Sequence, residues 1–145
     1  MKFSKKRNQY EASNVTFSQA NCEAYSYNWW KFVTVIDGLV IFNNYNYSPS
    51  TNKHQAKVRR LMSELGIKID LVVSTRESLD YSDKALESAI EGLKKDIAGL
   101  VEILGNNRRK RALDEERQGM IARKCNEIYQ ISKVLTGNSL AAALN

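Results

Sequence analysis

The chain has 145 residues, 43% of them hydrophobic and 26% charged, which is the size and composition of a single globular domain. Its single Pro and seven Gly argue against long disordered linkers. No apolar run approaches the ~18 residues of a membrane span, and the basic N-terminus lacks the apolar core of a signal peptide. Two distant cysteines without nearby ligands exclude a recognisable zinc motif and indicate a reducing compartment, so we expect a cytoplasmic protein without a membrane segment.

The net charge of +6 is unevenly distributed along the chain. Residues 1–78 hold eleven Lys and Arg against six Asp and Glu, a balance of +5, whereas residues 79–145 hold eleven against ten. We therefore divide the chain into a basic unit, 1–78, and a unit of mixed charge, 79–145. A basic unit attracts polyanions at long range, although many basic proteins bind no nucleic acid.

Residues 1–22 are polar and weakly patterned, with one short strand expected around Val15 and Phe17. We expect a solvated, flexible tail, and the alternative is an arm that becomes ordered against phosphates on binding. A small basic cluster near its start consists of Lys2, Lys5, Lys6 and Arg7.

Two dense runs of aromatic and β-branched residues, 29–36 and 39–42, flank Asp37-Gly38. This pattern predicts a β-hairpin with a type I′ turn, because both turn positions need positive φ. A two-residue turn fixes the register, so Ile36 should face Leu39 and Val33 should face Phe42. The expected core face carries Trp30, Phe32, Ile36, Leu39, Ile41 and Tyr45.

A helix is predicted next, with Ser50 or Thr51 as the N-cap and with an end near Leu65, where Gly66 follows. Its apolar face consists of His54, Val58, Leu61, Met62 and Leu65. Its opposite face is basic and consists of Lys53, Lys57 and Arg60, with Arg59 beside them. Such a helix packs one face and leaves the basic face available.

Apolar residues alternate over 67–73, which predicts a half-buried strand after this helix. The order of elements predicts a small ββαβ sheet with one packed helix. The expected fold class is α+β, with a long antiparallel helical hairpin after this unit.

The hairpin is predicted from a heptad-like apolar pattern over about 79–104. Its first helix starts either at the capping-box sequence 74–77 or near Asp80 or Ser82. A second helix is expected from about Arg108 to Leu135 and should end at 136–138. Arg117 and Lys124, in the second stripe, should snorkel or pair with carboxylates such as Asp96 or Asp83 on the facing helix.

Two apolar stripes cannot cover one another completely. The hairpin should therefore pack on the sheet of the basic unit, on a second copy or on a partner, and we expect a homodimer through residues 79–135.

The basic helix face is the most specific candidate site, since its cations suit contact with a phosphate backbone. The alternative is a solvated face in which Arg60 pairs with Glu64 one turn later. Other candidate phosphate contacts are Lys5, Lys6 and Arg7 near the N-terminus, and Arg108, Arg109, Lys110 and Arg111 at the tip of the helical hairpin. Trp29, Tyr45 and Tyr47 are candidates for stacking on bases, and otherwise belong to the core.

The sequence contains no recognisable catalytic motif. His54 is the only histidine, and a role as base toward Ser48, Ser50 or Tyr47 lacks an accompanying oxyanion or metal motif. There is no phosphate loop and no dinucleotide glycine pattern. We therefore expect a packed His54, no cofactor, no metal and no enzymatic activity.

The run Asn43-Asn44-Tyr45-Asn46-Tyr47-Ser48, followed by Thr51, Lys53, His54, Gln55, Lys57, Val58 and Arg59, resembles stretches in small accessory proteins of tailed bacteriophages. The resemblance covers residues 29–67 and implies an accessory protein expressed inside a bacterium. The predicted function is non-catalytic binding of DNA or RNA. The alternatives are a module that inhibits or redirects a host or phage protein, and a binder of small anionic ligands such as nucleotides.

Overall fold

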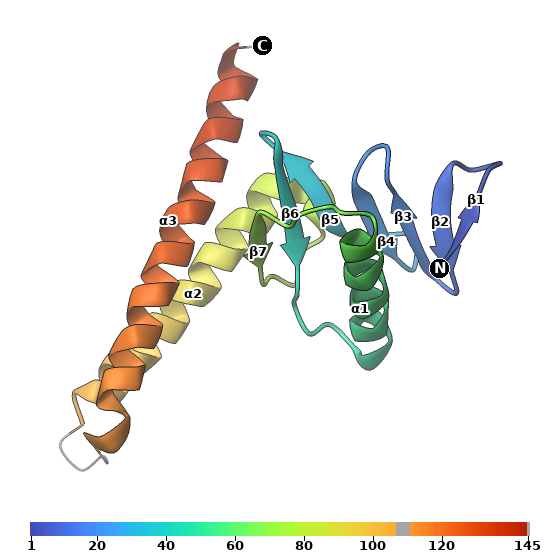
Figure 1. Cartoon of the computed structure of the whole chain (residues 1–145). Helices are drawn as coiled ribbons and strands as arrows, with labels where there is room; N and C mark the ends of the chain where they lie inside the picture. Colours follow the sequence, from blue (N-terminus) through green and yellow to red (C-terminus); the bar gives the residue numbers. More distant parts are fainter. Residues whose placement is uncertain (107–110, 145) are drawn as a thin grey trace.

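The computed structural model describes residues 1–106 and 111–144, which form a seven-stranded sheet and three α-helices (Figure 1). The strands lie in the sheet in the order in which they occur in the chain. They are β1 (Lys2–Ser4), β2 (Gln9–Ala12), β3 (Val15–Ser18), β4 (Glu23–Ser26), β5 (Trp30–Ile36), β6 (Leu39–Asn43) and β7 (Leu71–Val73). The expected mixed α+β class is confirmed.

Strands β1 to β6 form an antiparallel meander, and β7 pairs with β6 in parallel. A parallel pair needs a crossover connection, which α1 (Pro49–Glu64) provides. The tight turns of the meander contain left-handed residues, namely Asn8, Asn14, Cys22, Tyr27, Asn28, Asp37 and Gly38. Asn, Asp and Gly tolerate this conformation best, so local sequence favours most of these turns.

The expected register of β5 and β6 is confirmed, because Ile36 pairs with Leu39 and Val33 with Phe42. Asp37 and Gly38 both have positive φ, at 53° and 74°, as a type I′ turn requires. The Asp-Gly pair therefore fixed this hairpin locally.

A row of cross-strand partners runs across the whole sheet under α1. It consists of Phe3, Tyr10, Phe17, Ala24, Val33, Phe42 and Val72, one from each strand. Val58, Leu61 and Met62 of α1 pack on the middle of this row and bury Phe17 and Phe42. The apolar face predicted for this helix is thus confirmed.

A β-bulge in β5 interrupts the alternation of side chains between the two faces of the sheet. Tyr25 lies opposite Lys31, whereas the preceding Ala24 lies opposite Val33, so Phe32 is the extra residue. Phe32 and Val33 consequently both contact the core beneath α1.

Both faces of the β5–β6 hairpin contribute side chains to a core. The second core contains Ile36, Ile41, Val73, Leu79, Ala85, Leu86, Ala89, Ile131 and Val134. These side chains join β5, β6 and β7 to α2 (Ser82–Leu104) and α3 (Asp114–Leu144), which lie on the sheet face opposite α1 (Figure 1). The prediction that these residues share one core face was wrong, because the bulge divides them between two cores. Leu39, beside the turn, is exposed.

Helices α2 and α3 pack side by side and extend well beyond the sheet (Figure 1). A 3-10 turn, η1 (Leu79–Tyr81), precedes α2, so the expected start near Ser82 is confirmed and the start at the capping box is not. A second 3-10 turn, η2 (Arg111–Leu113), precedes α3. None of the helices in the described part of the chain is long and apolar enough to cross a membrane.

Three expected boundaries differ from the structure. The N-cap of α1 is Ser48, because Pro49 fits the first helical position, where its missing N–H costs nothing. Strand β7 begins only at Leu71. Helix α3 continues through Gly137, since one interior glycine costs only about 1 kcal/mol and Ile131 and Val134 anchor the preceding turns.

The largest difference concerns residues 1–22, which form the three strands β1 to β3 rather than a flexible tail. Val15 and Phe17 are buried under α1, with relative exposures of 1% and 0%. Tertiary packing thus orders a segment whose local pattern is weak.

Candidate functional site

The basic face of α1 consists of Lys53, Lys57, Arg59 and Arg60, and all four side chains are exposed. Burial of Val58, Leu61 and Met62 orients the helix so that these cations point away from the sheet core. Within residues 1–106 and 111–144, no carboxylate lies at ion-pair distance from any of the four. The alternative pair between Arg60 and Glu64 is therefore not formed.

Arg59 differs from its three neighbours because it also contacts the core. Its guanidinium lies 5.2 Å from the centre of the Phe42 ring, in a cation–π contact that covers this buried ring. Lys53, Lys57 and Arg60 have no such contact among the described residues. Arg59 thus has a structural role in addition to its charge.

The other predicted cationic clusters lie apart from α1. Lys5, Lys6 and Arg7 are exposed in the turn between β1 and β2, where Arg7 forms an ion pair with Glu11. Arg108, Arg109 and Lys110 lie outside the described residues, as does the side chain of Arg111. Of these two clusters, the structure therefore gives the side-chain positions of Lys5, Lys6 and Arg7 alone.

The predicted stacking residues separate into two groups. Tyr45 is half-buried and packs against the core beneath α1. Trp29 and Tyr47 are 55% and 37% exposed, and their ring centres lie 6.0 Å apart at 75°. Trp29 follows the β4–β5 turn, in which Tyr27 and Asn28 are held in the left-handed conformation. A bulky residue such as Tyr27 rarely adopts this conformation, so the turn that presents Trp29 stores strain.

Trp29 and Tyr47 line a hollow of about 380 Å³ that we call the aromatic groove. Its residues are Trp29, Tyr47, Arg76, Glu77, Ser78, Asp80 and Tyr81. Tyr81 is 69% exposed, and the guanidinium of Arg76 lies 5.7 Å from the centre of the Tyr47 ring. The sequence did not point to Arg76 or Tyr81, because residues 74–82 were considered only as the start of a helix.

The two carboxylates of the aromatic groove have cationic partners. Asp80 pairs with Lys31 at 3.3 Å, and Glu77 pairs with Lys84 at 3.6 Å. Burial alone would lower the pKa of Lys31, but its hydrogen bonds to Glu23 and Asp80 raise that pKa above the ordinary value. Arg76, by contrast, forms no ion pair within the described part of the chain. Arg76 is therefore the cation of the groove that is available to a ligand.

Buried hydrogen bonds hold the segment that carries Arg76. The Asn43 side chain donates to the Thr75 carbonyl at 2.8 Å and accepts from the Thr75 N–H at 3.2 Å. The indole N–H of Trp30 donates to the Arg76 carbonyl at 2.9 Å, and the Lys31 N–H donates to the Ser78 hydroxyl at 3.0 Å. The backbone of the groove is thus fixed before any ligand arrives.

His54 belongs to a buried polar chain rather than to a surface site. Its Nδ1 lies 2.7 Å from the Ser26 hydroxyl oxygen, which lies 3.2 Å from that of Thr51. Ser26 and His54 are 1% and 6% exposed, so a substrate cannot reach either group. The expected packed histidine is confirmed, whereas pairing with Ser48, Ser50 or Tyr47 is not observed.

The position of His54 predicts a loss of stability in mild acid. Burial first, and the Lys57 charge second, lower its pKa below the ordinary value of 6.5. The unfolded chain then binds more protons, so the free energy of unfolding falls as the pH decreases through 6.5, by at most about 1.4 kcal/mol per pH unit. Urea unfolding at pH 7.5 and 5.5 should show this decrease for the natural chain and not for His54→Gln. Equal stability of the natural chain at both pH values would contradict it.

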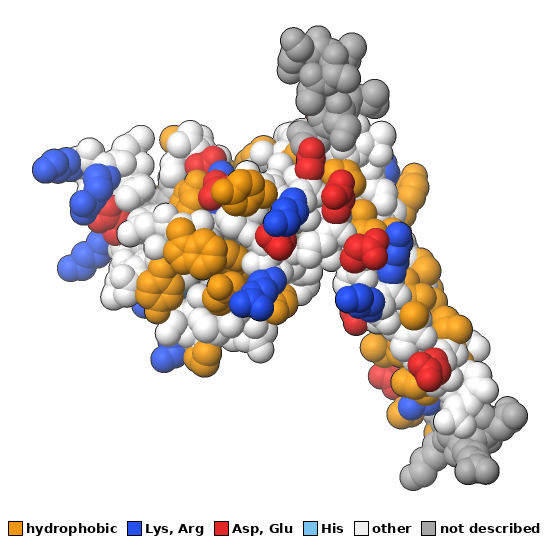
Figure 2. All heavy atoms as spheres, turned by 180° about the vertical axis from the view of Figure 1, so that it is seen from behind, with side chains coloured by type: hydrophobic (Ala, Val, Ile, Leu, Met, Phe, Trp, Pro, Cys, Tyr) orange, Lys and Arg blue, Asp and Glu red, His pale blue; other side chains and the backbone are white. Residues whose placement is uncertain are grey.

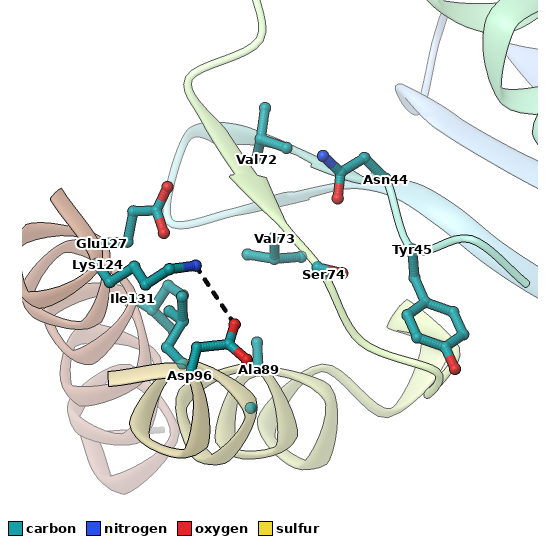
Figure 3. Close-up of a pocket in the computed structure, with 12 residues that line it drawn as sticks. Asn44, Tyr45, Val72, Val73, Ser74, Ala89, Asp96, Lys124, Glu127 and Ile131 are labelled. Atoms are coloured by element: carbon teal, nitrogen blue, oxygen red, sulfur yellow. Dashed lines mark hydrogen bonds and ion pairs between the residues drawn. The ribbon is translucent and has the colours of Figure 1, made fainter. Parts of the chain in front are cut away.

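A further hollow of about 470 Å³ lies between the ends of β6 and β7 and the middle of α2 and α3 (Figure 3). Lys124 of α3 forms an ion pair with Asp96 of α2 at 3.3 Å in this hollow, which confirms one of the expected pairings. Asn44 and Ser74 line the opposite side. The described residues contain no cluster of side chains suited to a metal ion.

Comparison with protein-family models, curated proteins and solved structures finds no match to this chain.

Proposed function

We propose that the protein binds nucleic acid and that the basic face of α1 contacts the phosphate backbone. The observation that carries this proposal is the exposure of Lys53, Lys57, Arg59 and Arg60 on one helix without an ion-pairing carboxylate among the described residues. Cations without internal partners can exchange their counterions for phosphates at little structural cost.

Several other cations of the molecule, in contrast, form ion pairs with carboxylates. Arg7, Lys31, Lys84, Lys94 and Lys124 each pair with at least one carboxylate. A polyanion that approaches these residues competes with an existing partner, whereas one that approaches the basic face does not.

The proposal is tested by fluorescence anisotropy of labelled 20-mer DNA and RNA, single-stranded and duplex, from 50 to 300 mM salt. The logarithm of the affinity should fall linearly with the logarithm of salt concentration, with a slope of about −0.7 to −0.9 per phosphate contacted. Absent binding, or binding insensitive to salt, would contradict the proposal.

A second candidate is a homodimer or a protein partner bound through the far part of α2 and α3. Val101, Ile103 and Leu113 are 41–55% exposed there, and hydrophobic side chains line this arm in Figure 2. Apolar side chains exposed in a contiguous patch favour a protein interface. Light scattering should then give a mass near twice 16.5 kDa at micromolar concentration. A monomer mass across that range would exclude the homodimer.

A further inference from the structure

The aromatic groove has features that the basic face of α1 lacks. It combines three exposed rings, those of Trp29, Tyr47 and Tyr81, with the cation of Arg76 in a hollow of about 380 Å³. Figure 2 shows hydrophobic side chains gathered beside Lys and Arg side chains over the sheet, on the face turned away from the viewer in Figure 1. Exposed apolar side chains that gather in one patch with a polar rim mark interaction sites.

The ring geometry leaves room for a planar ligand. Tyr47 meets Trp29 at 75°, an edge-to-face contact that occupies at most one face of the indole. Tyr47 is itself held by Trp30, at 5.3 Å between ring centres, and by Tyr45, at 6.4 Å. Trp29, which is 55% exposed, therefore offers indole surface to a ligand beside a ring that its aromatic neighbours hold in place.

The guanidinium of Arg76 suits an anionic group of a ligand. Glu77 pairs with Lys84, and Asp80 shares Lys31 with Glu23, whereas Arg76 forms no ion pair among the described residues. A proline-rich peptide also fits aromatic grooves, but it offers the guanidinium only neutral carbonyl oxygens and no negative charge. A nucleotide offers a planar base to the ring and a phosphate to the cation.

We propose that the aromatic groove binds an unpaired base of a single-stranded nucleic acid, with Trp29 as the stacking surface and Arg76 as the contact to the adjacent phosphate. This inference rests on the proposed function and deepens it, because a duplex keeps its bases stacked inside and cannot offer one to Trp29. The basic face of α1 contacts phosphates of either form, and the groove adds a preference for single strands.

Fluorescence anisotropy with a 20-nucleotide single strand and a 20-base-pair duplex tests this inference. Trp29→Ala should lower affinity for the single strand by about 5- to 100-fold and leave affinity for the duplex unchanged. Trp29→Phe should retain most of the affinity, because it keeps a ring. Tyr129→Ala is the matched control, since Tyr129 is 60% exposed on α3 away from the groove, and it should change neither affinity.

The outcomes separate the two proposals. If Trp29→Ala kept its single-strand affinity while variants of the basic face lost theirs, the proposal that the groove binds a base would be wrong, and the proposed function would stand. Equal losses of single-strand and duplex affinity in Trp29→Ala would also contradict base binding in the groove. Binding of a decaproline peptide instead of the oligonucleotides would overturn both. Arg76→Ala supplies a second variant and should reduce the single-strand affinity and its salt dependence together.

Discussion

Replacing Lys57 and Arg60 by Glu should lower the affinity for both single-stranded and duplex nucleic acid by on the order of 100-fold at 0.1 M salt. The two side chains lie three positions apart on α1, both are exposed, and neither has a carboxylate partner among the described residues. Their loss removes two phosphate contacts, and the new carboxylates repel the same phosphates. The salt slope should become shallower by about 1.4 to 1.8, because each lost contact removes about 0.7 to 0.9.

A matched control separates a local contact from an effect of net charge. Lys94→Glu with Lys95→Glu changes the net charge equally, and both residues are exposed on α2. We expect this variant to keep its affinity within about threefold, since screening over a Debye length of about 10 Å limits long-range effects. Equal losses in the two double variants would show that only total charge matters, and the basic face would then not be a site.

Local sequence signals were sufficient for the hairpin and for α1. The Asp37-Gly38 pair dictates a turn type through its backbone preferences alone, and Gly66, with φ of 73°, ends α1 as expected. The helical period placed Val58 and Met62 on the buried face and Lys53 and Lys57 outside. The cationic part of the candidate site was therefore predictable, because helix geometry fixes which side chains share a face.

The sequence patterns did not predict features that depend on residues far apart in the chain. Strands β1 to β4 are three or four residues long, which is too short for a clear alternating pattern. Pairing between neighbouring strands is what aligns Tyr10, Phe17 and Ala24 in one apolar row. The bulge at Phe32 likewise depends on the pairing with β4, and it moves side chains between faces. A period-two pattern read along one strand cannot detect either effect.

The aromatic groove was missed for the same physical reason. Trp29 and Tyr47 were recognisable as aromatic residues, but Arg76 joins them through contacts with distant residues. Asn43 binds the backbone of Thr75, 32 positions away in the chain, and the Trp30 indole binds the Arg76 carbonyl. Nothing in residues 74–77 alone indicates this contact. An Asn at the end of a strand is ordinarily read as a turn residue, and here it positions a second segment.

Asn43→Ala should lower the free energy of unfolding by about 3 kcal/mol, because it leaves buried backbone groups without partners. Asn43 is 0% exposed, and its side chain serves the Thr75 N–H and carbonyl as well as the Tyr45 N–H. Asn43→Asp keeps the acceptor oxygen but places a carboxylate beside the Thr75 carbonyl. Its stability loss should therefore be similar at pH 7 and smaller at pH 4, where the protonated acid can donate.

The matched control for Asn43 is its neighbour in the chain. Asn44 is exposed, and its backbone N–H donates to the Val73 carbonyl at 2.9 Å, a bond that Asn44→Ala preserves. Asn44→Ala should change the free energy of unfolding by no more than about 0.5 kcal/mol. Urea unfolding followed by circular dichroism measures all three variants. If Asn43→Ala were no less stable than Asn44→Ala, the segment that carries Arg76 would not depend on Asn43, and the preformed groove would lose its physical basis.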